Sequence, residues 1–177
     1  LRTVVRSGIL LRIIFSLLAF VCVIYAEGQI LKFQGQEFEA ENVTSSIVAI
    51  NGEKAIKVER DLNILPFDID HLGATVDEPT YVRLKNVSLD NGVIEVKVLS
   101  RVQENTPCPG SQGFIGVAFR INEDNTAYES FYLRPRVGRS DNQFARNHTV
   151  QYYSYPDYKF DKLRKDPRAA YETAAPV

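Results

Sequence analysis

From Phe38 onward, apolar residues recur at nearly every second position, and turn-forming residues interrupt them at short intervals. A period of two is typical of β-strands with one buried face, because successive side chains point to opposite sides of a sheet. The clearest case is the segment 46–60, where two alternating runs flank Asn51-Gly52. Since Asn-Gly favours the tight turns that join antiparallel strands, this segment predicts a β-hairpin.

A second hairpin is expected where Asp90-Asn91-Gly92 joins the run 81–89 to the run 93–102. In the latter run, apolar and charged residues alternate, which indicates a sheet with one solvated face. The next run, 114–121, has apolar residues on one face and mostly small or apolar residues on the other. We therefore expect it to lie in the centre of a sheet.

Beyond a polar turn at 122–126, the run 127–134 alternates again and ends at Pro135, which predicts another strand. Residues 136–147 read as a loop, 148–155 as a strand, and 159–171 as the one helical segment, interrupted at Pro167. The stretch 62–79 fits a long crossover loop between strands rather than a linker between domains. Many short antiparallel strands without a long helix predict an all-β sandwich of two sheets, formed by one domain over 27–177.

The N-terminal segment has a different character. Arg2, Arg6 and Arg12 precede an apolar run over 13–26, and polar residues follow it. This layout predicts a signal peptide over 1–26 and a secreted, periplasmic or extracellular protein. An uncleaved N-terminal membrane anchor over the same residues is the alternative, and it would be the only contact with a membrane.

Charge narrows the choice of partners. The chain has 21 basic and 22 acidic side chains, and loss of residues 1–26 would remove three arginines and no acid. Proteins that bind nucleic acids normally concentrate basic residues, so we expect no nucleic-acid partner. Only Cys108 would remain in the mature chain, so no internal disulfide is expected.

Candidate chemistry gathers between residues 127 and 158, a stretch that contains six of the nine tyrosines together with arginine, asparagine, aspartate and histidine side chains. Tyrosine offers a flat apolar ring with a hydrogen-bonding tip, and the other side chains add directional donors and acceptors. This combination suits a sugar-like ligand or a wet interface. Tight packing of a long loop across a sheet is the alternative interpretation.

The segments FIGVAFRINEDNTAYESFYLRP and GRSDNQFARNHTVQYYSYPDY resemble the concanavalin A-like lectin/glucanase superfamily. Within it, the chain is most similar to secreted domains grouped with the 3-keto-disaccharide hydrolase and laminin G-like families. The resemblance is strongest over 114–158 and rests only on the strand pattern over 38–102. It implies a jelly-roll sandwich whose concave sheet carries a site for a carbohydrate or glycoside.

The resemblance also implies further strands after the tyrosine-rich region, so we expect a sandwich that is incomplete at its C-terminus. Calcium is common among superfamily members, and Asp68, Asp70 and Asp77 could bind a structural ion. No other cofactor and no catalytic metal is expected. The Glu-x-Asp-x-x-Glu motif of laminarinase-type members is missing from this chain, which disfavours that chemistry.

Candidate catalytic residues are an acid or base near the tyrosines: Glu129, Asp141 and His148. Candidate ligand-binding residues are the aromatic, arginine and amide side chains of the same stretch: Tyr132, Arg134, Arg139, Gln143, Asn147, Tyr152 and Tyr155. Each has a structural alternative. Glu129 could form a cross-strand ion pair with Arg120, Arg134 could fix a loop, and His148 could serve as a hydrogen-bonding fixture.

Three functions remain open from the sequence. A secreted domain could bind or process carbohydrate, which we favour, and it would then bring Tyr132, Arg134, Arg139, Asp141, Asn147 and Tyr155 to one concave surface. A hydrolase or lyase that acts on glycosides would additionally need an acid or base there. A structural or adhesive exported domain would instead present a flat surface without a pocket.

Overall fold

A computed structural model describes residues 28–104 and 106–176. Its nine strands are β1 (Ile30–Phe33), β2 (Gln36–Glu41), β3 (Val43–Ile50), β4 (Glu53–Arg60), β5 (Tyr81–Leu84), β6 (Ile115–Phe119), β7 (Tyr128–Leu133), β8 (Val150–Tyr155) and β9 (Glu172–Thr173). The helical elements are short: a 3-10 turn η1 (Leu72–Ala74), α1 (Pro135–Gly138), α2 (Gln143–Arg146) and α3 (Phe160–Leu163).

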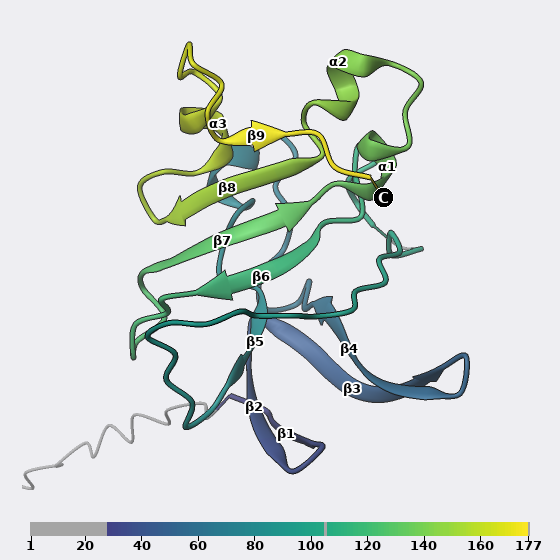
Figure 1. The fold of residues 1–177 in the computed structure, drawn as a ribbon, viewed down its shortest axis with the longest axis vertical. Helices are drawn as coiled ribbons and strands as arrows, with labels where there is room; N and C mark the ends of the chain where they lie inside the picture. Colours follow the sequence, from purple (N-terminus) through teal and green to yellow (C-terminus); the bar gives the residue numbers. More distant parts are fainter. Residues whose placement is uncertain (1–27, 105, 177) are drawn as a thin grey trace, which may run out of the picture.

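All strand pairings are antiparallel, and the described strands form three sheets. One sheet has the order β1-β2-β5, the hairpin β3-β4 forms the second, and the third has the order β6-β7-β8-β9. In Figure 1 the four-stranded sheet occupies the upper half of the molecule, and the other two extend below it. The protein is thus mostly β with antiparallel sheets, as an all-β sandwich requires.

Register gives the four-stranded sheet two distinct faces. Tyr132 pairs with Gly116 on one side and Gln151 on the other, and Ser130 pairs with Ala118 and Tyr153. Directly paired residues point to the same face of a sheet. We call this face the tyrosine face: Gly116, Ala118, Tyr128, Ser130, Tyr132, Gln151, Tyr153, Tyr155 and Glu172.

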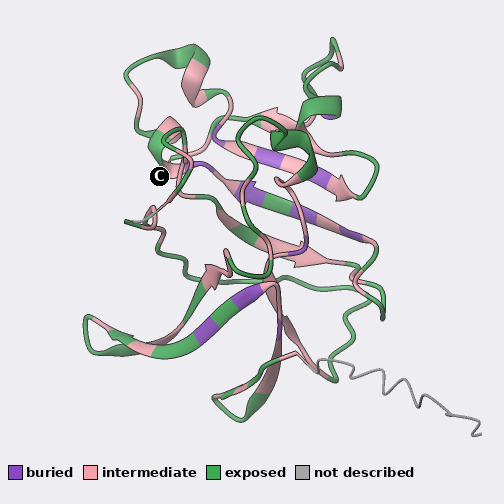
Figure 2. Cartoon of the chain, turned by 180° about the vertical axis from the view of Figure 1, so that it is seen from behind, coloured by how far each residue is buried: buried purple, intermediate pink, exposed green. Residues whose placement is uncertain are grey.

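Buried side chains concentrate on the tyrosine face, as the purple segments of β7 and β8 show in Figure 2. Tyr128, Tyr132, Tyr153 and Leu163 form the cluster of buried apolar residues, with exposed fractions of 8% or less. The Tyr128 and Tyr153 rings meet edge to face at 5.6 Å, and their hydroxyls share a hydrogen bond of 2.9 Å. A core built of tyrosines places polar groups inside the protein, where they must find partners.

The opposite face of this sheet is apolar and partly open. The Phe119 and Phe131 rings stack at 5.9 Å, Tyr152 packs against Phe131 at 5.2 Å, and Phe131 remains 51% exposed. Alternation along β7 therefore separates buried tyrosines from an aromatic row on the far side of the sheet.

Several expectations are confirmed. β3 and β4 pair through the turn at Asn51 and Gly52, whose φ angles of 51° and 85° are the positive values that such a turn needs. β7 and β8 lie where the alternation predicts, and the stretch 62–79 is a loop apart from η1. The helical prediction over 159–171 is confirmed only for the four residues of α3.

Three expectations are wrong. The run 93–102 forms no strand, so the second hairpin is missing and β5 ends at Leu84. Alternation indicates only that a segment can use one face, whereas a strand also needs a partner backbone, and no described segment pairs with this run. β6 is an edge strand and not a central one, and the expected loop at 136–147 contains the one-turn helices α1 and α2.

The signal peptide or anchor expected over 1–26 lies outside the described residues. Among the residues that the structure describes, none belongs to a helix that is long and apolar enough to cross a membrane.

Candidate functional site

A cleft of about 760 Å³ lies over the tyrosine face. Its floor is the sheet, through Ala118, Ser130, Tyr132 and Tyr153. Its walls come from the crossover loop 62–79, the ends of β3 and β4, and the loop 101–114. Clefts of this size are typical of small-molecule sites, particularly where an apolar lining carries a few convergent polar groups.

The tyrosine hydroxyls of the floor keep their protons. Burial raises the pKa of Tyr132 and of Tyr153 well above the usual tyrosine range. The Tyr132 hydroxyl accepts a hydrogen bond of 3.0 Å from Arg134 Nη2, so its own O–H remains a donor. The floor therefore combines ring surfaces with hydroxyl groups, both of which suit a ligand with apolar and hydroxylated faces.

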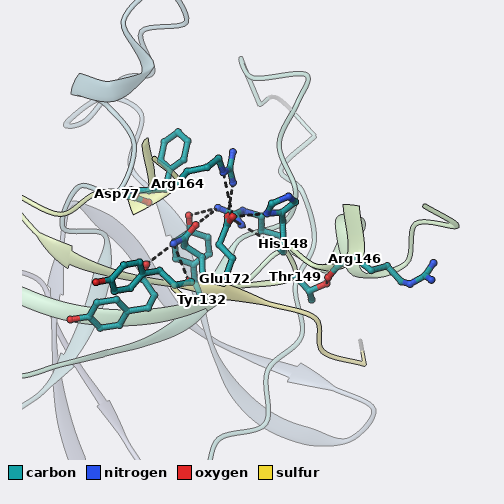
Figure 3. A network of polar contacts seen from close by, with 12 residues as sticks. Asp77, Tyr132, Arg146, His148, Thr149, Arg164 and Glu172 are labelled. Atoms are coloured by element: carbon teal, nitrogen blue, oxygen red, sulfur yellow. Dashed lines mark hydrogen bonds and ion pairs between the residues drawn. The ribbon is translucent and has the colours of Figure 1, made fainter. Parts of the chain in front are cut away.

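At one end of the floor, a buried guanidinium organises a polar network (Figure 3). Arg134 Nη1 donates to Glu172 Oε1 at 2.9 Å and to the backbone oxygen of His148 at 2.8 Å. Its Nη2 donates to the Tyr132 hydroxyl and to Gln151 Oε1, both at 3.0 Å. The side chains of Arg134 and Glu172 are only 7% and 8% exposed, so this is a buried ion pair with nearly all its donors satisfied.

Glu172 collects hydrogen-bond partners from three separate segments of the chain. Besides Arg134, Arg164 Nη2 donates to its Oε1 at 2.6 Å, and His148 Nδ1 lies 2.5 Å from its Oε2. Burial acts to raise the pKa of Glu172, but the hydrogen bonds from Arg164, His148 and Arg134 outweigh it and hold the pKa at about 2. Glu172 is therefore ionised throughout the physiological range and fixes the three side chains around it.

His148 stands between two hollows. It lines the cleft over the tyrosine face and also a neighbouring pocket of about 400 Å³, together with Phe144 and Arg164. Its Nδ1 is held by Glu172, and its Nε2 has no hydrogen-bond partner among the described residues. An imidazole oriented by a carboxylate, in a residue that lines two hollows and whose second nitrogen is unpaired among the described residues, has the arrangement of a general base.

Among the described residues, Asp77 contributes the one carboxyl group of the cleft lining. Its Oδ2 accepts a hydrogen bond of 2.9 Å from the backbone N–H of Phe160, at the start of α3, and its backbone oxygen accepts from the Tyr128 hydroxyl at 3.2 Å. Burial raises the pKa of Asp77, against the opposing effects of the Phe160 N–H and the Arg134 charge. Its φ of 53° is a left-handed conformation that few non-glycine residues adopt, so the surrounding contacts hold it in place.

Two of the residues singled out in the sequence lie on the far face of the sheet. Glu129 accepts a hydrogen bond of 2.7 Å from Arg120 and one of 2.9 Å from the Tyr152 hydroxyl. The expected cross-strand ion pair is therefore confirmed, and the hydrogen bond from Arg120 lowers the pKa of Glu129. Neither Glu129 nor Tyr152 can reach the cleft from there, because the sheet lies between.

Four other candidates belong to the loop around α1 and α2. Arg139 and Asp141 are exposed, and Gln143 and Asn147 are exposed and hydrogen bonded to each other at 2.7 Å. None of the four lines the cleft or the smaller pocket. The structure therefore brings Tyr132, Arg134 and His148 together and leaves these four apart from them.

Tyr155 belongs to the tyrosine face but lies beyond the cleft. Its ring stacks on Tyr128 at 5.2 Å, and its hydroxyl donates to Glu78 at 3.0 Å. Among the described residues, no group of three acidic, histidine or cysteine side chains could hold a metal. Asp68 instead binds the His71 ring and two backbone N–H groups, so the structural calcium stays a prediction.

Sequence reasoning missed Glu172 and the place of Asp77 in the cleft, and it grouped Tyr153 with Tyr152 without separating the two faces of their strand. Glu172 lies 38 positions from its partner Arg134 in a two-residue strand, which no periodicity reveals. Tyr153 could have been assigned from the alternation of β8, since it shares its face with Gln151 and not with Tyr152.

No family model, no curated protein and no solved structure matches the chain.

Proposed function

We propose that this protein is an exported carbohydrate-binding or carbohydrate-processing domain with a jelly-roll architecture. In this proposal the ligand lies in the cleft over the tyrosine face, and the rings of Tyr132 and Tyr153 contact its apolar side. The cleft itself is the observation that carries the proposal, because it combines aromatic walls with hydroxyl and charged groups in a volume of about 760 Å³.

The buried network around Arg134 supports the same proposal. A binding floor must hold its polar groups in fixed positions, since each loose side chain costs entropy when a ligand orders it. Arg134 fixes the Tyr132 hydroxyl in the floor, and the fully buried Gln151 beside it, through bonds of 3.0 Å. Tyr132 and Arg134 thus keep roles in the site, with Tyr132 as the contact and Arg134 as its support.

Blocking the cleft tests the proposal. Gly110 lines the cleft, and a Cβ built on it meets no atom within 4 Å, so Gly110→Trp adds bulk without a local clash. On a glycan array and by calorimetry with the best oligosaccharide, we expect the variant to lose at least tenfold in affinity. Gly73→Trp is the matched control, because Gly73 is equally open but lies outside the cleft lining. Equal affinities for wild type and Gly110→Trp would refute the proposed location.

A hydrolase or lyase acting on glycosides is the second candidate, and the His148–Glu172 pair favours it. His148 Nε2 can take a proton from an attacking water, or from a substrate carbon, while Glu172 stabilises the resulting imidazolium. No laminarinase-type acid pair is needed for that role.

Turnover tests this second candidate. In reducing-sugar and 3-keto-glycoside assays, His148→Gln should lower the rate about 100-fold or more, with the affinity for the ligand retained. His71→Gln is the control, since His71 is the chain's other histidine and is exposed beside Asp68. If wild type shows no turnover of either substrate, the enzyme candidate is wrong and the binding domain remains.

The third candidate, a structural or adhesive exported domain, requires a flat surface. The open aromatic row at Phe119, Phe131 and Tyr152 is the feature that favours it. This candidate is favoured over the other two if wild type binds no carbohydrate and self-associates in sedimentation experiments. Phe131→Ser should then abolish the self-association.

A further inference from the structure

We infer that the carbohydrate bound in the cleft carries an anionic group, as a uronic acid or a sulfated sugar does. This inference rests on the proposed function and narrows its ligand class.

The cleft concentrates positive charge, although the chain as a whole has almost no net charge. The whole chain has a formal net charge of −1. The charged side chains of the cleft lining are nevertheless four arginines and one aspartate, with His148 as a titratable neighbour: Arg60, Arg101, Arg134, Arg164 and Asp77. Including Glu172 at the end of the floor, the four guanidinium groups still outnumber the two carboxylates, so the local potential is opposite in sign to that of the chain.

The four arginines come from four separate segments. Arg60 ends β4, Arg101 belongs to the loop before β6, Arg134 follows β7, and Arg164 follows α3. A solvated charged face of a single helix or strand would place its arginines on one element. Here the fold brings arginines from four segments to one cleft. A cleft lined by charges of one sign attracts ligands of the opposite sign.

Two of these guanidinium groups retain free donors. Arg101 is exposed and has no hydrogen bond or ion pair with the residues described. Arg164 reaches Glu172 through Nε and Nη2, whereas its Nη1 has no partner among the described residues. Arg134 and Arg60 are engaged by carbonyl, carboxylate and hydroxyl oxygens, so they supply charge and rigidity rather than contacts.

Carboxylate and sulfate groups match these donors. A planar guanidinium gives two parallel N–H groups to a carboxylate or sulfate oxygen pair, and charge-assisted bonds of this kind are stronger than bonds to a neutral hydroxyl. The lone carboxyl of Asp77 does not cancel the field, because four guanidinium groups line the same cleft. With a neutral sugar bound, the free N–H groups of Arg101 and Arg164 would form hydrogen bonds with water and would gain no charged partner.

The test compares matched ligands on the full chain. Wild-type protein is titrated with a glucuronic acid oligosaccharide, with a sulfated glucose oligosaccharide and with the neutral glucose oligosaccharide of the same linkage. We expect at least one anionic ligand to bind tenfold or more tightly than the neutral one, and that preference to shrink as NaCl is raised from 0.05 to 0.5 M.

Variants locate the preference. Arg101→Gln and Arg164→Gln should each reduce affinity for the anionic ligand about threefold to tenfold and leave the neutral ligand almost unchanged. Arg168→Gln is the control, because Arg168 is exposed, pairs with Asp166 and lies outside the lining. If a variant folds poorly, the NaCl dependence of the wild-type preference for the anionic ligand still tests the inference.

Equal, salt-independent affinity for the neutral and anionic ligands would overturn the inference and leave the carbohydrate site standing. If the protein binds none of the three ligands and no other sugar on an array, the proposed function is overturned, and the inference falls with it. A preference that survives both substitutions would place the anionic site elsewhere on the protein and overturn the inference as well.

Discussion

Replacing Glu172 by glutamine should lower the free energy of unfolding by about 3 kcal/mol, because breaking a buried ion pair leaves the other charge without its partner. Arg134 would keep its bonds to Tyr132, Gln151 and the His148 backbone, but its 7% exposed guanidinium would lose the carboxylate that neutralises it. Glutamine preserves the shape of the side chain, so the loss reports charge. Urea denaturation at pH 7 measures it.

The exposed pair Asp166–Arg168 provides the control for that prediction. Its oxygen and nitrogen lie 2.5 Å apart, but the Arg168 side chain is 74% exposed. Asp166→Asn should therefore cost little, as is usual for solvent-exposed ion pairs. Similar losses in Glu172→Gln and Asp166→Asn would mean that the buried network contributes no more than a surface contact.

Acidification should destabilise the protein through the same carboxylate. The pKa of Glu172 falls from 4.5 to about 2 on folding, so the folded state binds its proton more weakly than the unfolded state. The resulting stability is present above pH 4.5 and is lost as the pH falls towards 2. At 1.36 kcal/mol for each pKa unit, the loss is about 3 kcal/mol. Asp77 opposes part of it, because its raised pKa makes protonation favourable to the folded state.

Urea midpoints between pH 7 and pH 2 measure this dependence. The wild type should lose stability below pH 4.5, and Glu172→Gln should lose markedly less over the same range, since the titrating group is gone. Parallel curves for the two proteins would show that Glu172 is not the group responsible.

Local patterns predicted those parts of the fold that depend on local chemistry. Asn51-Gly52 specifies its own turn, and the alternation of Tyr128, Ser130 and Tyr132 correctly separates the two faces of β7. Tyr132, Arg134 and His148 were found for the same reason, because they lie close together in sequence as well as in space.

What remained hidden depends on contacts between distant segments. The position of β6 at a sheet edge follows from which segments pair with it, and the alternation of 93–102 could not reveal that this run stays unpaired. The role of Glu172 depends on the pairing of β9 with β8, which places Glu172 beside Gln151 and within hydrogen-bond distance of Arg134. The loop 136–147 folds into one-turn helices, the second held by Asn142, whose side chain accepts from two backbone N–H groups.

The two faces of the β6–β9 sheet differ in chemistry, and the account depends on that difference. One face carries buried tyrosines, an organised guanidinium and a cleft; the other carries Glu129 and Tyr152 in an open aromatic row. Tyr132 and Tyr152 face opposite sides, although both stood as equal candidates in the sequence. The proposal therefore specifies which face of the sheet binds the ligand as well as which residues do.

The most direct measurement of that claim is an NMR titration of the protein with ring-labelled tyrosine against the best oligosaccharide from the array. The account predicts that the resonances of Tyr132 and Tyr153 shift on binding and that Tyr152 stays unchanged. Shifts at Tyr152 with Tyr132 and Tyr153 unaffected would place the ligand on the far face and contradict the account.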